Sequence, residues 1–151
     1  MGLEIQINED IKNAMLARDK RKLEALRAVK AALLLEKTGA GSTEITQEIE
    51  LKLLQKLVKQ RKESAQIFST QGRMDLAEEE SFQAEVIEKY LPEQLSDDEI
   101  KSIIQSIITQ TGATSMKEMG MVMGLANKEL AGKADSKTIS GFVKDCLSQA
   151  K

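Results

Sequence analysis

The 151-residue chain contains no histidine, no tryptophan, one cysteine and one proline. A structural zinc site needs about four cysteine or histidine ligands, so this composition excludes one. Histidine, the usual base that activates a serine or cysteine nucleophile, is also missing. The single cysteine, Cys146, excludes an internal disulfide and suits a reducing compartment. From these absences we expect a cytoplasmic protein that holds no metal and no cofactor.

Long apolar segments are absent as well. The longest apolar run, residues 31–35, is far shorter than the ~20 residues that a membrane-spanning helix needs. The N-terminal segment is acidic and lacks the apolar core of a signal peptide. The sequence therefore predicts no association with membranes. The net charge of −2 is unusual for a protein that coats nucleic acid, so any anion-binding surface must be local.

What the chain does contain is an abundance of strong helix formers, with only 3% aromatic residues, which predicts an all-α fold. Residues 38–43 are rich in glycine, serine and threonine and predict a loop. Apolar side chains recur at helical spacing in seven segments, approximately 4–17, 20–37, 44–68, 74–90, 97–109, 116–130 and 136–148.

Polar residues before several of these segments predict helix starts. Asp19 and Asp135 are suited to cap the second and the last helix. Ser96 with Glu99, and Ser115 with Glu118, have the spacing of capping boxes. We therefore expect the fifth and sixth helices to begin directly after these serines.

Pro92 divides the chain, because the residue before a proline avoids the helical region. We predict a helical N-terminal domain, residues 1–92, and a small helical C-terminal domain, residues 93–151. The first contains 15 basic and 16 acidic side chains and the second contains 7 and 8. Neither half is basic as a whole.

Two clusters of basic residues are candidates for contacts with phosphate groups. The alternative interpretation is a solvated face balanced by nearby glutamates. Arg61 differs from both clusters because it lies in the apolar stripe of the third helix. We predict that it is partly buried and paired with Glu79 or Glu80. The clusters are Lys20, Arg21, Lys22, Arg27 and Lys30, and then Lys52, Lys56, Lys59 and Lys62.

The C-terminal half has three further features that the sequence interprets as packing. Cys146 lies near the end of the last helix, where the helix dipole disfavours a thiolate, so we expect a poor nucleophile. Gly120 and Gly124 have the GxxxG spacing, which predicts close helix packing. Met116, Met119 and Met123 form a stripe that predicts a core face, with an adaptable partner groove as the alternative.

An ordered set of segments resembles the YqeY-like family. These segments are residues 23–27, 58–62, 72–77, 90–95, 118–120, 123–124, 132–135 and 143–144. The family commonly has two glutamates three residues apart after the third segment. Here Glu80 is followed by Gln83, so one ion pair of the family is in question. On this resemblance, the structural signature residues are Arg27, Arg61, Asp75, Glu80, Tyr90, Pro92, Gly120, Gly132 and Asp135.

The resemblance implies a two-part helical fold whose C-terminal domain, of three helices, is similar to the tail of GatB. GatB is a subunit of the tRNA-dependent amidotransferase and uses that tail to engage tRNA. The resemblance also implies the family's label, a carbon–nitrogen ligase with glutamine as amido-N-donor. We find no ATP-binding motif and no activated nucleophile, and a shared domain does not transfer an enzyme's chemistry.

We therefore expect a non-catalytic accessory protein that binds tRNA, or a tRNA-handling enzyme such as an amidotransferase. One alternative is a protein–protein adaptor that uses the Met-rich helix or an exposed helical groove. A second is an enzyme with an unrecognised site among the acidic residues 75–88. The candidate contacts are Lys52, Lys56, Lys59, Lys62, Arg73, Lys128 and Lys133.

Overall fold

The computed structural model describes residues 2–39 and 44–149. Within these ranges the chain forms seven α-helices and one short 3-10 helix, and no strand. The predicted all-α fold is thus confirmed. The chain divides into two compact units, Met1–Leu91 and Pro92–Lys151, each of which has its own core. The predicted loop at residues 38–43 falls mostly on residues 40–43, which lie outside the described ranges.

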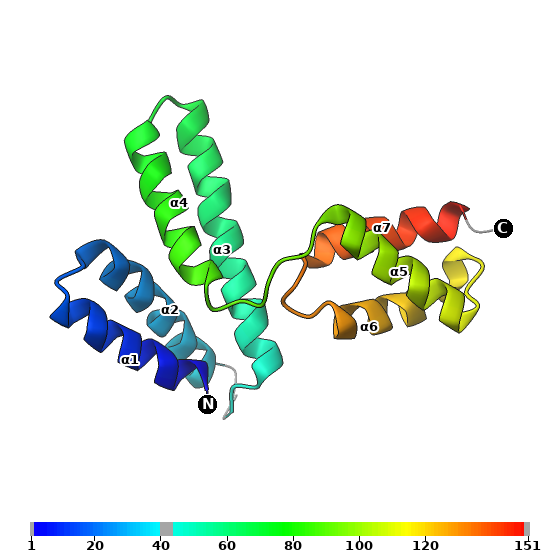
Figure 1. Ribbon diagram of the computed structural model, residues 1–151, viewed down its shortest axis with the longest axis horizontal. Helices are drawn as coiled ribbons and strands as arrows, with labels where there is room; N and C mark the ends of the chain where they lie inside the picture. Colours follow the sequence, from blue (N-terminus) through cyan, green and yellow to red (C-terminus); the bar gives the residue numbers. More distant parts are fainter. Residues whose placement is uncertain (1, 40–43, 150–151) are drawn as a thin grey trace. The chain divides into compact units, whose positions relative to one another are not determined.

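The first unit consists of two helical hairpins (Figure 1). Helices α1 (Leu3–Leu16) and α2 (Lys20–Thr38) pack side by side, as do α3 (Gln47–Thr70) and α4 (Met74–Glu88). Asp19 caps α2 as predicted, since its Oδ1 accepts a hydrogen bond from the Lys22 amide at 3.1 Å. Helix α2 also contacts both α3 and α4, which joins the two hairpins into one unit.

The core of the first unit contains side chains from all four helices. Each fully buried aliphatic side chain contributes roughly 1.5–3 kcal/mol relative to an exposed one. No charged or polar residue is buried among the described residues, so hydrophobic burial dominates the stability. The most deeply buried residues here are Ile7, Leu26, Val29, Leu54 and Ile87.

The second unit consists of three mutually packed helices, α5 (Asp97–Thr111), α6 (Met119–Glu129) and α7 (Ser136–Gln149). Ser96 and Glu99 form the predicted capping box, in which each side chain accepts a hydrogen bond from the other residue's backbone amide. Gly112 ends α5 in the left-handed conformation, with φ of +72°. The core residues include Ile104, Val122, Leu130, Val143 and Leu147.

The second predicted capping box is wrong. Ser115 makes no side-chain cap, and the residues after it form the 3-10 helix η1 (Met116–Glu118). The Glu118 carboxylate instead accepts a hydrogen bond from the Thr114 amide at 3.0 Å, one residue earlier than the box requires. The α-helix therefore begins only at Met119.

Several helix boundaries also differ from the predicted ones by two residues or more, including the ends of α3 at Thr70 and of α5 at Thr111. Helix α3 begins at Gln47 rather than at residue 44, because the Thr46 hydroxyl caps it through the Ile49 amide at 3.3 Å. Helix α4 ends at Glu88, two residues before the predicted end. The following residues turn so that Tyr90 reaches α1, and this tertiary contact overrides the helical preference of the sequence.

The glycine pair of α6 does not mediate close helix packing. Gly120 and Gly124 are exposed, and a Cβ atom added to either would meet no atom within 4 Å. The methionine stripe is divided, because Met119 and Met123 pack against the core while Met116 is exposed.

Across residues 2–39 and 44–149, the length and apolar content of each helix fall short of what crossing a membrane requires.

Candidate functional site

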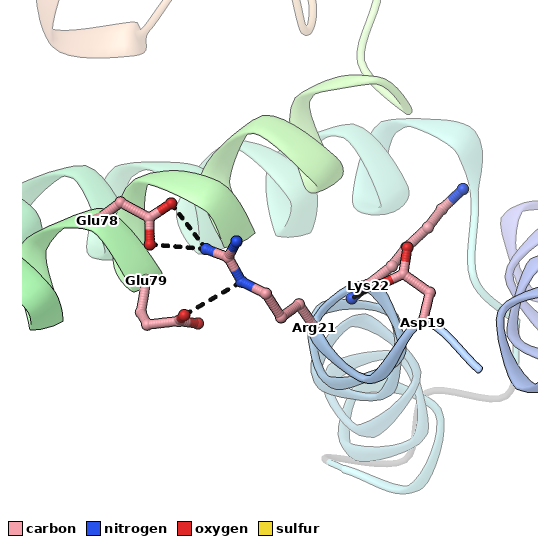
Figure 2. A network of polar contacts seen from close by, with 5 residues as sticks. All are labelled: Asp19, Arg21, Lys22, Glu78 and Glu79. Atoms are coloured by element: carbon pink, nitrogen blue, oxygen red, sulfur yellow. Dashed lines mark hydrogen bonds and ion pairs between the residues drawn. The ribbon is translucent and has the colours of Figure 1, made fainter. Parts of the chain in front are cut away.

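The first basic cluster contains an arginine that is already engaged within the first unit (Figure 2). Arg21 on α2 donates from Nη2 to both carboxylate oxygens of Glu78 on α4, at 2.7 and 2.8 Å. Its Nε lies 3.1 Å from Glu79 Oε1, and its guanidinium lies 4.1 Å from the centroid of the Phe82 ring. The hydrogen bond to Glu78 raises the pKa of the guanidinium. Arg21 therefore connects α2 to α4, and a phosphate contact by this side chain would compete with these ion pairs.

The second basic cluster lies along α3, and its four lysines fall into two classes. Lys52 pairs with Glu48 at 3.3 Å, and Lys62 pairs with Glu88 of α4. Lys56 and Lys59 are exposed and have no ion pair with any described residue. Only these last two present uncompensated positive charge, so they are the strongest anion contacts of this cluster.

The other candidate contacts lie at turns. Arg73 precedes α4, and its Nε lies 3.6 Å from the Asp75 carboxylate, with both side chains exposed. Lys128 is in the last turn of α6, and Lys133 follows it in the connection to α7. Both lysines are exposed and form no ion pair within residues 2–39 and 44–149. Both candidate contacts of the second unit are thus unpaired with any described acidic residue.

Arg61 is half-buried as predicted, but the predicted partner is wrong. Its Nε donates to the Gln83 side-chain oxygen at 2.9 Å, and its Nη1 donates to the Leu57 carbonyl at 3.2 Å. Glu79 pairs with Arg21 instead, and Glu80 is half-buried without an ion pair to any described residue. Gln83 stands where the family commonly has a second glutamate. In this chain Arg61 is therefore bound at that position by a neutral amide.

Tyr90 connects the end of α4 to α1. Its hydroxyl donates a hydrogen bond to Oδ2 of Asp10, 80 positions away in the sequence. Burial, and then the hydrogen bond and negative charge of Asp10, raise the pKa of the Tyr90 hydroxyl. Asp10 was not among the predicted residues, because no sequence pattern links it to Tyr90.

The segment after Pro92 is held to the second unit by Gln94, which the sequence did not single out. Its Nε2 donates to the Pro92 carbonyl at 2.9 Å and to the Gly132 carbonyl at 2.7 Å. The Leu95 amide adds a bond to the Lys133 carbonyl at 3.1 Å. Gly132 is buried, and its φ of +74° is a conformation that other residues rarely adopt, which explains a glycine there.

The remaining signature residues are dispersed. Arg27 is exposed on α2, Asp75 is exposed on α4, and Gly120 is exposed on α6. Asp135 precedes α7, and its carbonyl accepts the Ile139 amide at 3.0 Å. The structure thus assigns packing or backbone contacts to some signature residues and does not gather them into one site.

Cys146, which the sequence predicts to be a poor nucleophile, is half-buried on α7. Burial, and next the charge of Asp145, raise the pKa of the Cys146 thiol, although Lys101 opposes them. The thiolate is therefore disfavoured, in the predicted direction, with burial as the largest cause. Within residues 2–39 and 44–149, no group of three or more acidic, histidine or cysteine side chains could hold a metal ion.

Comparison with known proteins gives the family. Residues 4–147, nearly the whole chain, match a family described as Yqey-like protein. The chain belongs to this YqeY-like family. A relative from Clavispora lusitaniae, named altered inheritance of mitochondria protein 41, mitochondrial, is 35% identical over 127 residues. The match covers 81% of this chain and 72% of the relative.

Proteins of the same name from two other fungi are more distant members of the group. The one from Pyrenophora tritici-repentis is 28% identical, over 94% of this chain and 79% of the relative. The one from Kluyveromyces lactis is also 28% identical, over 91% of this chain and 72% of the relative.

These names contradict the cytoplasmic location that we expected, because each of the relatives is named as a mitochondrial protein. The expectation rested on composition. A single cysteine suits any reducing compartment, so it does not distinguish the cytoplasm from other such compartments.

Proposed function

We propose that this chain is a non-catalytic accessory protein that binds tRNA, or a protein that handles tRNA, through exposed lysines on both of its units. The observation that carries the proposal is that four of the predicted contact residues, Lys56, Lys59, Lys128 and Lys133, are exposed and have no ion pair with a described residue. Lysines already neutralised by a glutamate gain less from a phosphate, because the existing pair must first be broken.

The physical basis is the release of counterions from a polyanion. Each phosphate neutralised by a lysine contributes about 0.7–0.9 to the slope of log affinity against log salt concentration. Four lysines would therefore give a slope of roughly −3, enough to weaken binding by more than tenfold between low and physiological salt. The overall charge of −2 makes the interaction depend on these local groups.

The test is fluorescence anisotropy of the full chain with labelled tRNA at several salt concentrations. Lys56→Gln/Lys59→Gln and Lys128→Gln/Lys133→Gln should each weaken binding and lower the salt slope by about 1.4–1.8. The matched control is Lys52→Gln/Lys62→Gln, which removes the same charge from the same helix but from lysines that are paired. We expect the control to have a clearly smaller effect.

Two outcomes would count against the proposal. Absence of saturable binding at low salt would leave the likeness to the GatB tail as a matter of ancestry alone. Equal losses in all three double variants would mean that diffuse charge, and not the free lysines, attracts the RNA.

We do not extend the carbon–nitrogen ligase label of the family to this chain. An amide-forming enzyme needs an activated acyl group and a source of ammonia, and the raised pKa of Cys146 leaves the only thiol a weak nucleophile. Release of ammonia from glutamine by the purified chain, abolished by a single substitution, would reverse this judgement.

A further inference from the structure

A groove with a cavity volume of about 450 Å³ lies between α2 and α3 in the first unit. Its lining combines apolar side chains, which we call the floor, with polar side chains, which we call the rim. On the α3 side the rim consists of Lys52, Lys56 and Gln60, and on the α2 side it includes Glu36. The floor comprises Ala32, Leu35, Ile49, Leu53 and Leu57.

Part of the apolar lining of the groove is exposed to water. In the leucine run of α2, Leu33 is buried in the core, whereas the Leu35 residue is 74% exposed. Ile49 and Leu53 are only half-buried, although neighbouring Leu54 and Leu57 are buried. Apolar side chains gathered in a concave surface and surrounded by charge are typical of an interaction site.

The residues of α3 that line the groove have helical periodicity in two parallel rows. Ile49, Leu53 and Leu57 form an apolar row that is about 12 Å long, at 1.5 Å per residue. Lys52 and Lys56 form a second row beside it, one turn apart. A complementary ligand therefore needs an apolar stripe a little over two turns long, with negative charges about 6 Å apart along one flank.

We propose that the groove between α2 and α3 binds an amphipathic helix of a partner protein, with two acidic residues four positions apart facing Lys52 and Lys56. Glu36 on the opposite rim disfavours acids on the other flank, so it fixes which way the partner's charged side faces. Lys56 is free for such a contact, whereas Lys52 must first release its exposed partner Glu48, so Lys56 contributes more of the charge selectivity.

RNA is a poorer occupant of this groove than a helix. No aromatic side chain lines it, so no base could stack there. A phosphate backbone would bring charge to the two lysines but would leave the apolar floor exposed to water. The inference goes beyond the proposed tRNA binding, which rests also on Lys59 and on the lysines of the second unit.

The test uses two labelled synthetic helical peptides that share one apolar stripe and differ only at two flanking positions, four residues apart. One peptide has glutamate at both positions and the other has lysine. In anisotropy titrations with the full chain, the acidic peptide should bind at least about tenfold more tightly. Lys52→Glu/Lys56→Glu should reverse this preference. Equal binding of the two peptides, or none, would overturn the proposal.

A second variant separates the apolar contact from the charge. Leu35→Gln should weaken the acidic peptide by about tenfold or more, because it places a polar amide in the floor without adding charge. Leu16→Gln is the matched control, since Leu16 is 75% exposed near the end of α1 and does not line the groove. Circular dichroism should show both variants folded, because neither leucine is buried. Equal effects of the two substitutions would contradict the assignment.

Two further outcomes distinguish this proposal from its competitors. If a second copy of the chain occupied the groove, light scattering would detect a dimer that Leu35→Gln dissociates, and the proposal would be wrong. Leu35→Gln adds no charge beside Lys56 and should leave tRNA affinity unchanged. Loss of tRNA binding in that variant would instead assign the groove to RNA. Failure of tRNA binding with peptide binding intact would reject only the function proposed above.

Discussion

The hydrogen bond from Tyr90 to Asp10 gives a residue-specific test of the first unit. Tyr90 follows α4 and Asp10 lies in α1, so the bond connects elements that are distant in the sequence. Replacing Asp10 with Asn removes the negative charge and keeps an acceptor. Replacing Tyr90 with Phe removes the donor and keeps the ring. The first change isolates the electrostatic effect, and the second measures the bond's contribution to stability.

The expected magnitudes follow from the burial of the pair. A hydrogen bond to a charged acceptor contributes roughly 1.5–3 kcal/mol when fully buried. Tyr90 and Asp10 are both half-buried, so water can replace part of the bond. We therefore expect Tyr90→Phe to lower the free energy of unfolding by about 1 kcal/mol, or about 4–8 °C in melting temperature for a unit of this size.

The pH dependence has a definite sign. The pKa of Tyr90 is raised in the folded chain, first by burial and then by Asp10. Above pH ~10, the unfolded chain has lost its phenolic proton while the folded chain keeps it. The unfolded state then binds fewer protons, so the free energy of unfolding falls as the pH rises above ~10. Below that pH this contribution is constant.

The assay is the absorbance of tyrosinate during an alkaline titration. The chain has one tyrosine and no tryptophan, so the signal comes from Tyr90 alone. The apparent pKa should be higher in native protein than in urea, and Asp10→Asn should lower it without returning it to the unfolded value, because burial persists. A native titration that coincides with the unfolded one, or that ignores Asp10→Asn, would refute the reasoning.

Two other substitutions test individual contacts. Gln83→Glu turns the hydrogen bond with half-buried Arg61 into an ion pair. We expect urea denaturation to show a free energy of unfolding that is higher by up to about 1 kcal/mol. A loss of stability would mean that the new carboxylate is desolvated there without adequate compensation. Gly124→Ala should stabilise α6 by about 0.5–1 kcal/mol, since its Cβ meets nothing. Gly112→Ala, where φ is +72°, should destabilise the same unit. If Gly124→Ala lowered the melting temperature, Gly124 would have a packing role after all.

The parts of the fold that local sequence determines were predictable. Helical periodicity gave the seven helices, and the caps at Asp19 and Ser96 depend on side chains within three residues. Ser115 illustrates the limit, because its capping-box spacing competes with a hydrogen bond from the Thr114 amide to Glu118. Where two local alternatives have similar energies, the surrounding packing selects one, and the sequence pattern does not contain that information.

Partners across helices were harder to predict. The half-burial of Arg61 followed from its place in an apolar stripe, but Gln83, Glu79 and Glu80 lie on the same helix within four residues of each other. Choosing among them requires the rotation of α4 against α3, which periodicity does not fix. The binding roles of Lys52, Lys56, Lys59, Lys62, Arg73, Lys128 and Lys133 remain predictions. The structure adds which of them are already paired.

The bonds of Gln94 and Leu95 have a consequence for exchanging parts between relatives. They attach residues 92–95 to the connection between α6 and α7, although those residues precede the first helix of their unit. A recombination junction after Leu91 keeps these bonds within one parental sequence. A junction just before Ser96 would look natural from the helix boundaries, yet it would combine one parent's Gln94 with the other parent's Gly132. Chimeric proteins joined at the first position should therefore fold more reliably than those joined at the second.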